Sequence, residues 1–265
     1  MNQNVAARLT LDVIEPADVM LQIAAAHPTQ ATESLMITTD RTVLEVAEVV
    51  VPGPGRVHCF RAEKGRVDIA YNATISGSDP SAVVSAADEI CYLRPSRYAE
   101  SDRLTAMAQA EFAGIDEPED LLPAISSWVG TQLSYVPGSS RPTDGAVETL
   151  LQRRGVCRDY AHLVIALLRS LDVPARLTSV YAPGLDPMDF HAVAEAAIDG
   201  RWYVVDATLL APRKSLVRIC TGRDAADTAF LSSYRGNVEL AALEVFAVVN
   251  GELPDDNVKE LVTLG

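Results

Sequence analysis

Cys157 is the residue of this chain best placed for chemistry, because it stands at the start of an apolar segment. Gly155-Val156 precedes it, and the run CRDYAHLVIALLRSL that it opens is apolar around nearly its whole circumference. This pattern predicts a buried helix that ends before Pro174. Backbone N–H groups at a helix start, and the positive end of the helix dipole, stabilise a thiolate nucleophile. The same N–H groups can stabilise a developing oxyanion.

A second set of reactive side chains lies in the segment FHAVAEAAIDGRWYVVDAT. Two β-like runs flank Asp199-Gly200, a dipeptide that favours a two-residue hairpin turn. With that turn, Asp206 faces Val193, and His191 becomes the diagonal neighbour of Asp206 on the same face. Diagonal neighbours have Cβ atoms about 7–8 Å apart or less, which lets a carboxylate hydrogen-bond an imidazole. A register slip of one residue would place the two side chains on opposite faces.

These three residues are the parts of a thiol acyl-transfer triad. In that arrangement Asp206 orients His191, and His191 holds Cys157 as a thiolate and then protonates the leaving amine. The alternative is structural: His191 is satisfied by a nearby Asp206, and Cys157 is only packed. Spacing alone leaves both hypotheses open.

The elements that would position these residues change in character along the chain. In the first 80 residues apolar and polar residues alternate, and about six short runs of this kind predict an antiparallel β-sandwich. Helical spacing follows, and then strand-like runs return. The predicted helices cover 102–113, 118–133, 144–154 and 157–171, and the later strands cover 175–181, 190–198 and 201–206. Two more apolar segments follow, at 216–221 and 243–249. This order predicts the α+β class rather than a doubly wound parallel sheet.

Composition narrows the expected partners. The chain has 265 residues and a net charge of −14, and 48% of its residues are hydrophobic. Without a dense basic patch, neither nucleic acid nor an anionic membrane surface is an expected partner. The N-terminus shows no secretory signal, and four scattered cysteines without a CxxC pair indicate a reducing cytoplasm. No nucleotide-binding or calcium-binding loop is visible, so no cofactor is predicted.

His162 is a further histidine close to the candidate nucleophile. It follows Cys157 by five residues, about 140° round a helix, so it cannot face the same pocket. A zinc site built from Cys157, His162, His191 and Asp206 would need His162 on the wrong face, so no metal is predicted. We expect His162 to form a buried pair with Asp159, one turn earlier.

The stretch GVCRDYAHLVIALLRSLDVPARLTSVYAP…DFHAVAEAAIDGRWYVVDATLLAP resembles the core of the bacterial transglutaminase-like superfamily, which includes cysteine-protease-like proteins. The segments SRYAESDRL (96–104) and RICTGRDAADTAF (218–230) resemble flanking segments of that family. The resemblance implies an N-terminal β-rich domain over 1–90 and a papain-like, transglutaminase-like catalytic domain over 91–265. It also implies Cys157 as the nucleophile, His191 as the base and Asp206 as the orienting acid.

Two further residues are weaker candidates for contact with the oxyanion or the substrate. The family also carries an aromatic residue near the position of Tyr135, whose hydroxyl is a candidate oxyanion donor; a merely packed tyrosine is the alternative. Where the family often has HAW, this chain has His191-Ala192-Val193, so a large aromatic residue beside the base is missing. Trp202, on the same predicted face of the hairpin, could replace that bulk.

We therefore expect a thiol-dependent hydrolase or acyltransferase that acts on peptide or isopeptide amide bonds of a peptide or protein through a Cys157 thioester. If water resolves the thioester, the enzyme is a protease or amidase; if a lysine amine does, it is a transglutaminase. Hydrolysis is favoured because no insertion that would shield the site from water is visible. A non-catalytic peptide-binding scaffold is the alternative from another class, and no oligomeric state is predicted.

Overall fold

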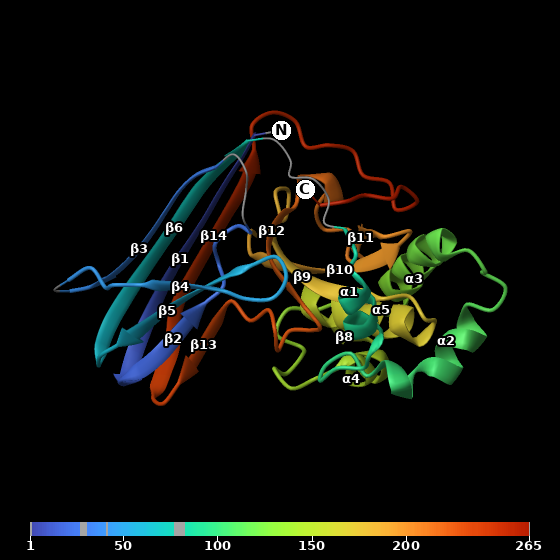
Figure 1. Cartoon of the computed structure of the whole chain (residues 1–265), viewed down its shortest axis with the longest axis horizontal. Helices are drawn as coiled ribbons and strands as arrows, with labels where there is room; N and C mark the ends of the chain where they lie inside the picture. Colours follow the sequence, from blue (N-terminus) through green and yellow to red (C-terminus); the bar gives the residue numbers. More distant parts are fainter. Residues whose placement is uncertain (1, 27–30, 41, 77–82, 265) are drawn as a thin grey trace.

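The computed structural model describes residues 2–26, 31–40, 42–76 and 83–264. A β-sandwich occupies one side of the molecule, and a third sheet with its helices occupies the other (Figure 1). The fold is α+β, which confirms the predicted class. Within the described ranges, no helix is long and apolar enough to cross a membrane.

Two four-stranded antiparallel sheets form the sandwich, in the orders β14–β1–β6–β3 and β13–β2–β5–β4. Strand β1 shows why the sequence folds this way, since Val5, Leu9 and Val13 are buried while Arg8 and Asp12 are exposed. This alternation confirms the predicted sandwich. The strands are β1 Asn2–Glu15, β2 Ala17–Leu21, β3 Ala31–Thr39, β4 Ala47–Val50, β5 Arg56–Ala62, β6 Gly65–Ser76, β13 Leu231–Tyr234 and β14 Asn237–Val249.

Two of the sandwich strands come from the far end of the chain. Strand β14 pairs with β1 from Gln3 opposite Val249 to Glu15 opposite Asn237, and β13 pairs with β2. From the sequence, these residues are expected in the catalytic domain over 91–265, with an apolar segment only from residue 243. The difference has a physical reason: an irregularity at Ala241, opposite Thr10 and Leu11, interrupts the alternation of apolar and polar residues along β14, in which only Val245 and Ala247 are buried.

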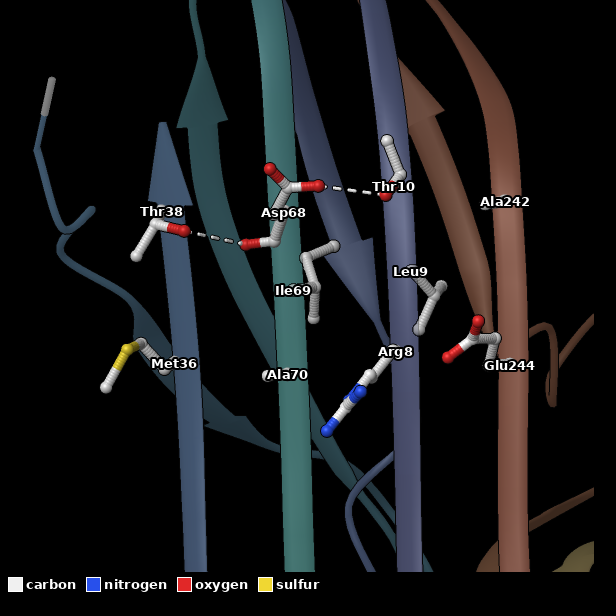
Figure 2. A pocket seen from close by; sticks show the side chains of 10 residues that line it. All are labelled: Arg8, Leu9, Thr10, Met36, Thr38, Asp68, Ile69, Ala70, Ala242 and Glu244. Atoms are coloured by element: carbon white, nitrogen blue, oxygen red, sulfur yellow. Dashed lines mark hydrogen bonds between the residues drawn. The ribbon is translucent and has the colours of Figure 1, made fainter. Parts of the chain in front are cut away.

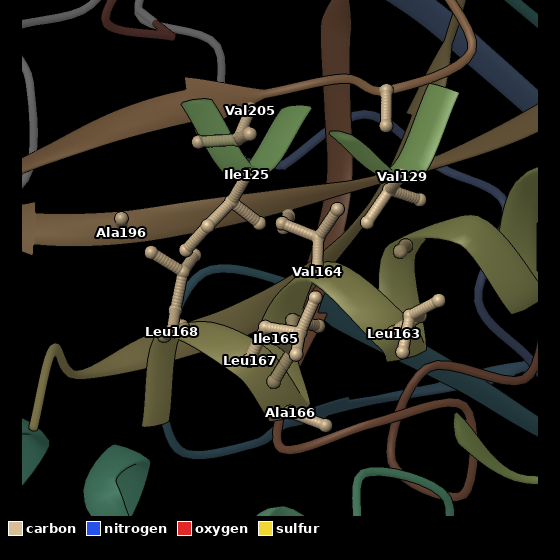
Figure 3. Packing of buried hydrophobic residues seen from close by; sticks show 14 of the residues in the cluster. Ile125, Val129, Leu163, Val164, Ile165, Ala166, Leu167, Leu168, Ala196 and Val205 are labelled. Atoms are coloured by element: carbon tan, nitrogen blue, oxygen red, sulfur yellow. The ribbon is translucent and has the colours of Figure 1, made fainter. Parts of the chain in front are cut away.

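The third sheet is also antiparallel, in the order β11–β10–β9–β12. Helix α5, Cys157–Ser170, packs against it and has twelve buried residues. Figure 3 shows Val164 and Leu168 of α5 close to Ile125 and Val129 of α3. The strands are β9 Ala175–Tyr181, β10 Phe190–Ile198, β11 Arg201–Val205 and β12 Val217–Gly222; the other helices are α1 Ala86–Leu93, α2 Thr105–Glu111, α3 Pro118–Gln132 and α4 Ala146–Gln152.

Helix α1 was absent from the sequence-based prediction. Only Tyr92 of its eight residues is buried, so the helix carries no apolar stripe. It is stabilised locally by a capping box, in which Ser85 Oγ accepts from the Asp88 amide and the Asp88 carboxylate accepts from the Ser85 amide.

The sandwich and the third sheet share one hydrophobic core. Tyr181 on β9 and Val217 and Ile219 on β12 belong to the same buried cluster as the inward residues of the sandwich. Tyr181 also donates a hydrogen bond of 2.7 Å from its hydroxyl to the carbonyl oxygen of Ile23. Because this packing is continuous, the sandwich is held in a fixed position against the sheet that carries the candidate histidine.

Candidate active site

Local structure at the start of α5 fixes Cys157 as the first residue of the helix. The Asp159 carboxylate accepts a hydrogen bond of 2.8 Å from the Val156 amide, which closes the first turn. Gly155 is required beside it, because a Cβ at that position would lie 2.6 Å from the Cβ of Asp159. The Cys157 side chain is half-buried, so its thiol remains within reach of a substrate.

The hairpin forms in the predicted register, with Ile198 opposite Arg201 and Ala194 opposite Val205. As that register requires, His191 and Asp206 meet: His191 Nε2 and Asp206 Oδ2 are 2.8 Å apart. The exposed fractions of the two residues are 2% and 3%, so this pair is shielded from bulk water.

Asp206 is held so that one carboxylate oxygen remains for the imidazole. The other oxygen, Oδ1, accepts hydrogen bonds from the Thr208 amide at 2.8 Å and the Thr208 hydroxyl at 2.7 Å. Ser126 on α3 donates from its hydroxyl to the carbonyl oxygen of Asp206 at 3.2 Å. Thr208 and Ser126 were not singled out from the sequence. An aspartate two residues before a threonine is a local turn signal that could have indicated Thr208.

The environment of His191 favours its charged form. Burial opposes a charge on the ring, but the Asp206 carboxylate and the Cys157 thiol outweigh it and raise the pKa of His191 well above 6.5. Burial also opposes ionisation of Asp206, yet His191 and Thr208 lower the pKa of that carboxyl group. Since Nε2 is bonded to Asp206, Nδ1 is the ring nitrogen left for the thiol. Nδ1 is buried and has no hydrogen bond of ordinary geometry within the described structure.

A cavity of about 440 Å³ has both Cys157 and His191 in its wall. A second cavity, of about 250 Å³, lies on the outer face of the β14–β1–β6–β3 sheet and includes Arg8, Asp68 and Glu244 (Figure 2). The ten residues that line this second cavity hold neither cysteine nor histidine. The cavity beside Cys157 is therefore the candidate active site.

A family model described as the transglutaminase-like superfamily matches residues 105–207. The crystal structure of a "Putative Cysteine Protease" from Cytophaga hutchinsonii is 32% identical in sequence to this chain. The structural match covers 98% of this chain and 96% of that one, with a TM-score of 0.89. The chain belongs to the transglutaminase-like superfamily.

Curated relatives of this transglutaminase-like chain match over shorter stretches. An uncharacterized protein of Mycobacterium leprae is 30% identical over 170 residues, which is 60% of this chain and 60% of the relative. An uncharacterized protein of Mycobacterium bovis is 38% identical over 74 residues, or 26% of this chain and 24% of the relative. The chain thus matches less than two thirds of the length of these relatives.

In this transglutaminase-like chain, Tyr135 lies beside the candidate nucleophile because two short segments pair. Strand β7, Ser134–Tyr135, is parallel to β8, Arg154–Gly155, and the Val136 amide donates to the Gly155 carbonyl oxygen at 3.0 Å. Burial and the neighbouring Cys157 thiol raise the pKa of Tyr135 to about 12. The hydroxyl is therefore protonated at neutral pH and able to donate a hydrogen bond.

Trp202 does not take the position expected of it. It lies opposite Ala197, at the turn end of the hairpin, and is outside the set of residues that line the cavity. Its ring is buried, with the Arg176 guanidinium 3.9 Å from the ring centroid and Tyr92 packed edge-on at 5.4 Å. The prediction that Trp202 adds bulk beside the base is wrong, because equal parity on a strand fixes the face and not the distance along it.

The expected pair of His162 with Asp159 is also absent. The Asp159 carboxylate is bonded to the Val156 amide and to Arg158, whereas His162 Nε2 accepts from the Ala225 amide at 3.1 Å. Burial lowers the pKa of His162 to about 4, which is consistent with a neutral ring that accepts a hydrogen bond. His162 does lie outside the cavity lining, and no metal-binding cluster occurs in the part of the chain that is described.

The pKa values of the two buried histidines, His191 and His162, are shifted in opposite directions. We expect nitrogen-detected NMR to show His191 still doubly protonated at pH 8, and His162 neutral at pH 6. The charged His191 stabilises the fold fully below pH 6.5, and this contribution is lost as pH rises through its raised pKa. The charged Asp206 stabilises the fold fully above pH 3.8, and this contribution is lost as pH falls through the lowered pKa of Asp206. A neutral His191 at pH 7 would contradict an ion pair between His191 and Asp206.

Proposed function

We propose that this member of the transglutaminase-like superfamily is a thiol-dependent hydrolase of peptide or isopeptide amide bonds. The observation that carries the proposal is the buried hydrogen bond between His191 Nε2 and Asp206 Oδ2, next to a cavity whose wall also holds Cys157. A buried imidazole with a fixed carboxylate on one nitrogen has its other nitrogen available for proton transfer.

The proposed reaction begins with Cys157 as a thiolate and His191 as an imidazolium. The sulfur attacks the carbonyl carbon of the amide, and the carbonyl oxygen takes up the negative charge. As the C–N bond breaks, His191 gives its Nδ1 proton to the leaving amine, and a thioester remains on Cys157. Water then passes a proton to His191 while its oxygen attacks the thioester, which releases the acid and restores the ion pair.

Two donors are available for the oxyanion of this reaction. One is the Cys157 amide, which begins α5 and has the positive end of the helix dipole behind it. The other is the Tyr135 hydroxyl. Burial and the Cys157 thiol raise the pKa of this hydroxyl and the Cys157 amide lowers it, so the hydroxyl lies beside the same residue. Donors fixed in this way stabilise charge that develops only in the transition state.

Replacing Tyr135 with phenylalanine tests the second donor. We expect the rate of acylation of Cys157 by an ester or amide to fall by about 10²- to 10³-fold. Alkylation by iodoacetamide should stay within about twofold, because that displacement develops no oxyanion at a carbonyl group. An equal loss in both reactions would mean that Tyr135 only supports the fold around the thiol.

Hydrolysis is favoured over amine transfer because the Cys157 side chain is half-buried rather than enclosed. The experiment is to incubate the protein with blocked glutamine- and lysine-containing peptides, with and without a primary alkylamine. Mass spectrometry then follows the peptides and the intact protein. Free acid with a transient acyl group on Cys157 supports the hydrolase, and amide formation with the alkylamine supports a transglutaminase. Peptides left intact, with no acyl group on Cys157, would contradict both and leave a binding scaffold.

A further inference from the structure

The cavity beside Cys157 has one strongly apolar wall, which the β-sandwich helps to build. Phe190 and Phe230 pack with their ring centroids 5.3 Å apart, and both line the cavity. Leu231 from β13 and Leu243 from β14 line it as well. All four side chains are partly buried against the shared core, so each keeps some apolar surface toward the cavity. Strands β13 and β14 therefore contribute to the candidate active site as well as to the sandwich.

Charged groups in the same lining are largely occupied by other partners. The Arg158 guanidinium donates to Asp159 Oδ1 at 2.9 Å, to the Arg141 carbonyl oxygen at 2.9 Å and to Ser140 Oγ at 3.2 Å. One oxygen of Asp189 accepts from the Phe190 amide at 2.7 Å. Arg158 and Asp189 carry opposite charges, and so do His191 and Cys157 in the proposed mechanism, so the lining has no net charge and a charged occupant gains little from it.

The segment that carries Phe230 is held in place without any ligand. Its beginning is fixed by the bond from the Ala225 amide to His162, and by the Tyr98 amide, which donates to Asp224 at 2.8 Å. The rings of Tyr98 and His162 stack with their centroids 5.4 Å apart. Because these anchors are buried or partly buried, the apolar wall is formed before a substrate arrives, and binding costs little ordering.

We propose that this cavity is a specificity subsite for a bulky, neutral, apolar group, of the leucine or phenylalanine class, in the acyl part of the substrate. A volume of about 440 Å³ is far more than an amide group needs and lies in the range of small-ligand sites. The proposal rests on the proposed function, since it needs an acyl group on Cys157. It adds the substrate class and assigns the β-sandwich a direct role in choosing the substrate.

The test compares four alkylating probes at pH 6.5: iodoacetamide, N-benzyl iodoacetamide, N-(2-aminoethyl) iodoacetamide and iodoacetylglycine. Peptide mapping measures the alkylation rate of Cys157 by each probe. Each rate is divided by the rate of the same probe with glutathione, which corrects for the intrinsic reactivity of the probe. We expect the benzyl probe to gain about tenfold or more over iodoacetamide, as burial of part of an aromatic ring provides. The cationic and anionic probes should gain less than about threefold, because Arg158 already bonds Asp159 and the exposed Asp189 carboxylate attracts a cation only weakly through water.

Variants of strand β14 test whether the gain of the benzyl probe arises in this cavity. Leu243→Trp should fill the subsite and cut the benzyl gain to about twofold, while Leu243→Ala should weaken it by about threefold. The matched control is Leu240→Trp, which alters a 39% exposed residue of the same strand outside the cavity lining. An unchanged iodoacetamide rate shows in each variant that the thiol site is intact.

The outcomes separate the two proposals. If iodoacetamide does not select Cys157 over the other cysteines, the proposed function fails. If it does, but the benzyl probe gains nothing or the Leu243 variants leave the gain unchanged, the subsite is overturned and the thiol chemistry stands. A preference for the cationic probe would also overturn the subsite, since it would show that Asp189 selects a basic group.

Discussion

Replacing Cys157 with alanine should abolish thioester formation and lower amide or ester turnover by about 10⁴-fold or more. The sulfur is the only atom of the side chain that can form the acyl bond, and a methyl group offers no substitute. The measurement is intact-protein mass spectrometry after incubation with an activated ester, together with the steady-state rate. The change should leave the free energy of unfolding within about 1 kcal/mol, because a small half-buried side chain replaces another.

Cys59→Ala is the matched control for this variant. Cys59 is also a free, half-buried cysteine, but it lies on β5 of the sandwich, away from the candidate site. We expect it to retain full turnover and full acylation of Cys157. Turnover that survived in Cys157→Ala, or an acyl group found on another cysteine, would remove Cys157 from the mechanism.

Replacing Asp206 with asparagine should lower the rate of acylation by about 10²- to 10⁴-fold, although the two side chains have nearly the same shape. Both carboxylate oxygens accept hydrogen bonds, Oδ1 from the amide and hydroxyl of Thr208 and Oδ2 from His191. An amide cannot serve both sides. If its NH₂ faces His191, the ring is forced into the wrong tautomer, and if it faces Thr208, it meets the Thr208 N–H donor.

The pH dependence distinguishes this effect from simple damage to the fold. Loss of the Asp206 charge removes the main influence that raises the pKa of His191, so the alkaline limb of the rate profile should move to lower pH. Asp189→Asn is the matched control, because Asp189 also lines the cavity but its side chain bonds the Phe190 amide rather than His191. Its profile should stay close to that of the unaltered protein. An Asp206→Asn variant with an unchanged rate and profile would make the carboxylate a structural group only.

Features that depend on residues close together in the sequence could be predicted, and features that depend on tertiary packing could not. The pairing of His191 with Asp206 was predictable, because the Asp199-Gly200 turn sets the register of a short hairpin. The start of α5 at Cys157 was predictable from the apolar run. The positions of these groups relative to one another depend on the packing of α5 against the sheet, which no local pattern encodes.

The errors follow the same logic. Asp159 was paired with His162 by helical spacing, although an acidic residue at the third position of a helix also favours a bond to the capping amide, as observed. Ser126 supports Asp206 from a helix 80 positions away in sequence, and only tertiary packing reveals that contact. The cavity wall formed by Leu231 and Leu243 depends on the return of the chain to the sandwich. The sequence gives only a weak signal for that return, because the alternation of apolar and polar residues along β14 is interrupted.

The most direct test of the proposed thiol–imidazole pair is the rate of alkylation of each cysteine by iodoacetamide at pH 6, resolved by peptide mapping. Cys59 and Cys91 are half-buried like Cys157, and burial raises the pKa of Cys220 to about 12, so the same molecule supplies its own controls. We predict that Cys157 reacts at least about tenfold faster than any of the others, because the proposed mechanism pairs its sulfur with the charged His191. Equal rates at Cys157, Cys59 and Cys91, or a Cys157 that resists alkylation, would contradict the proposed site.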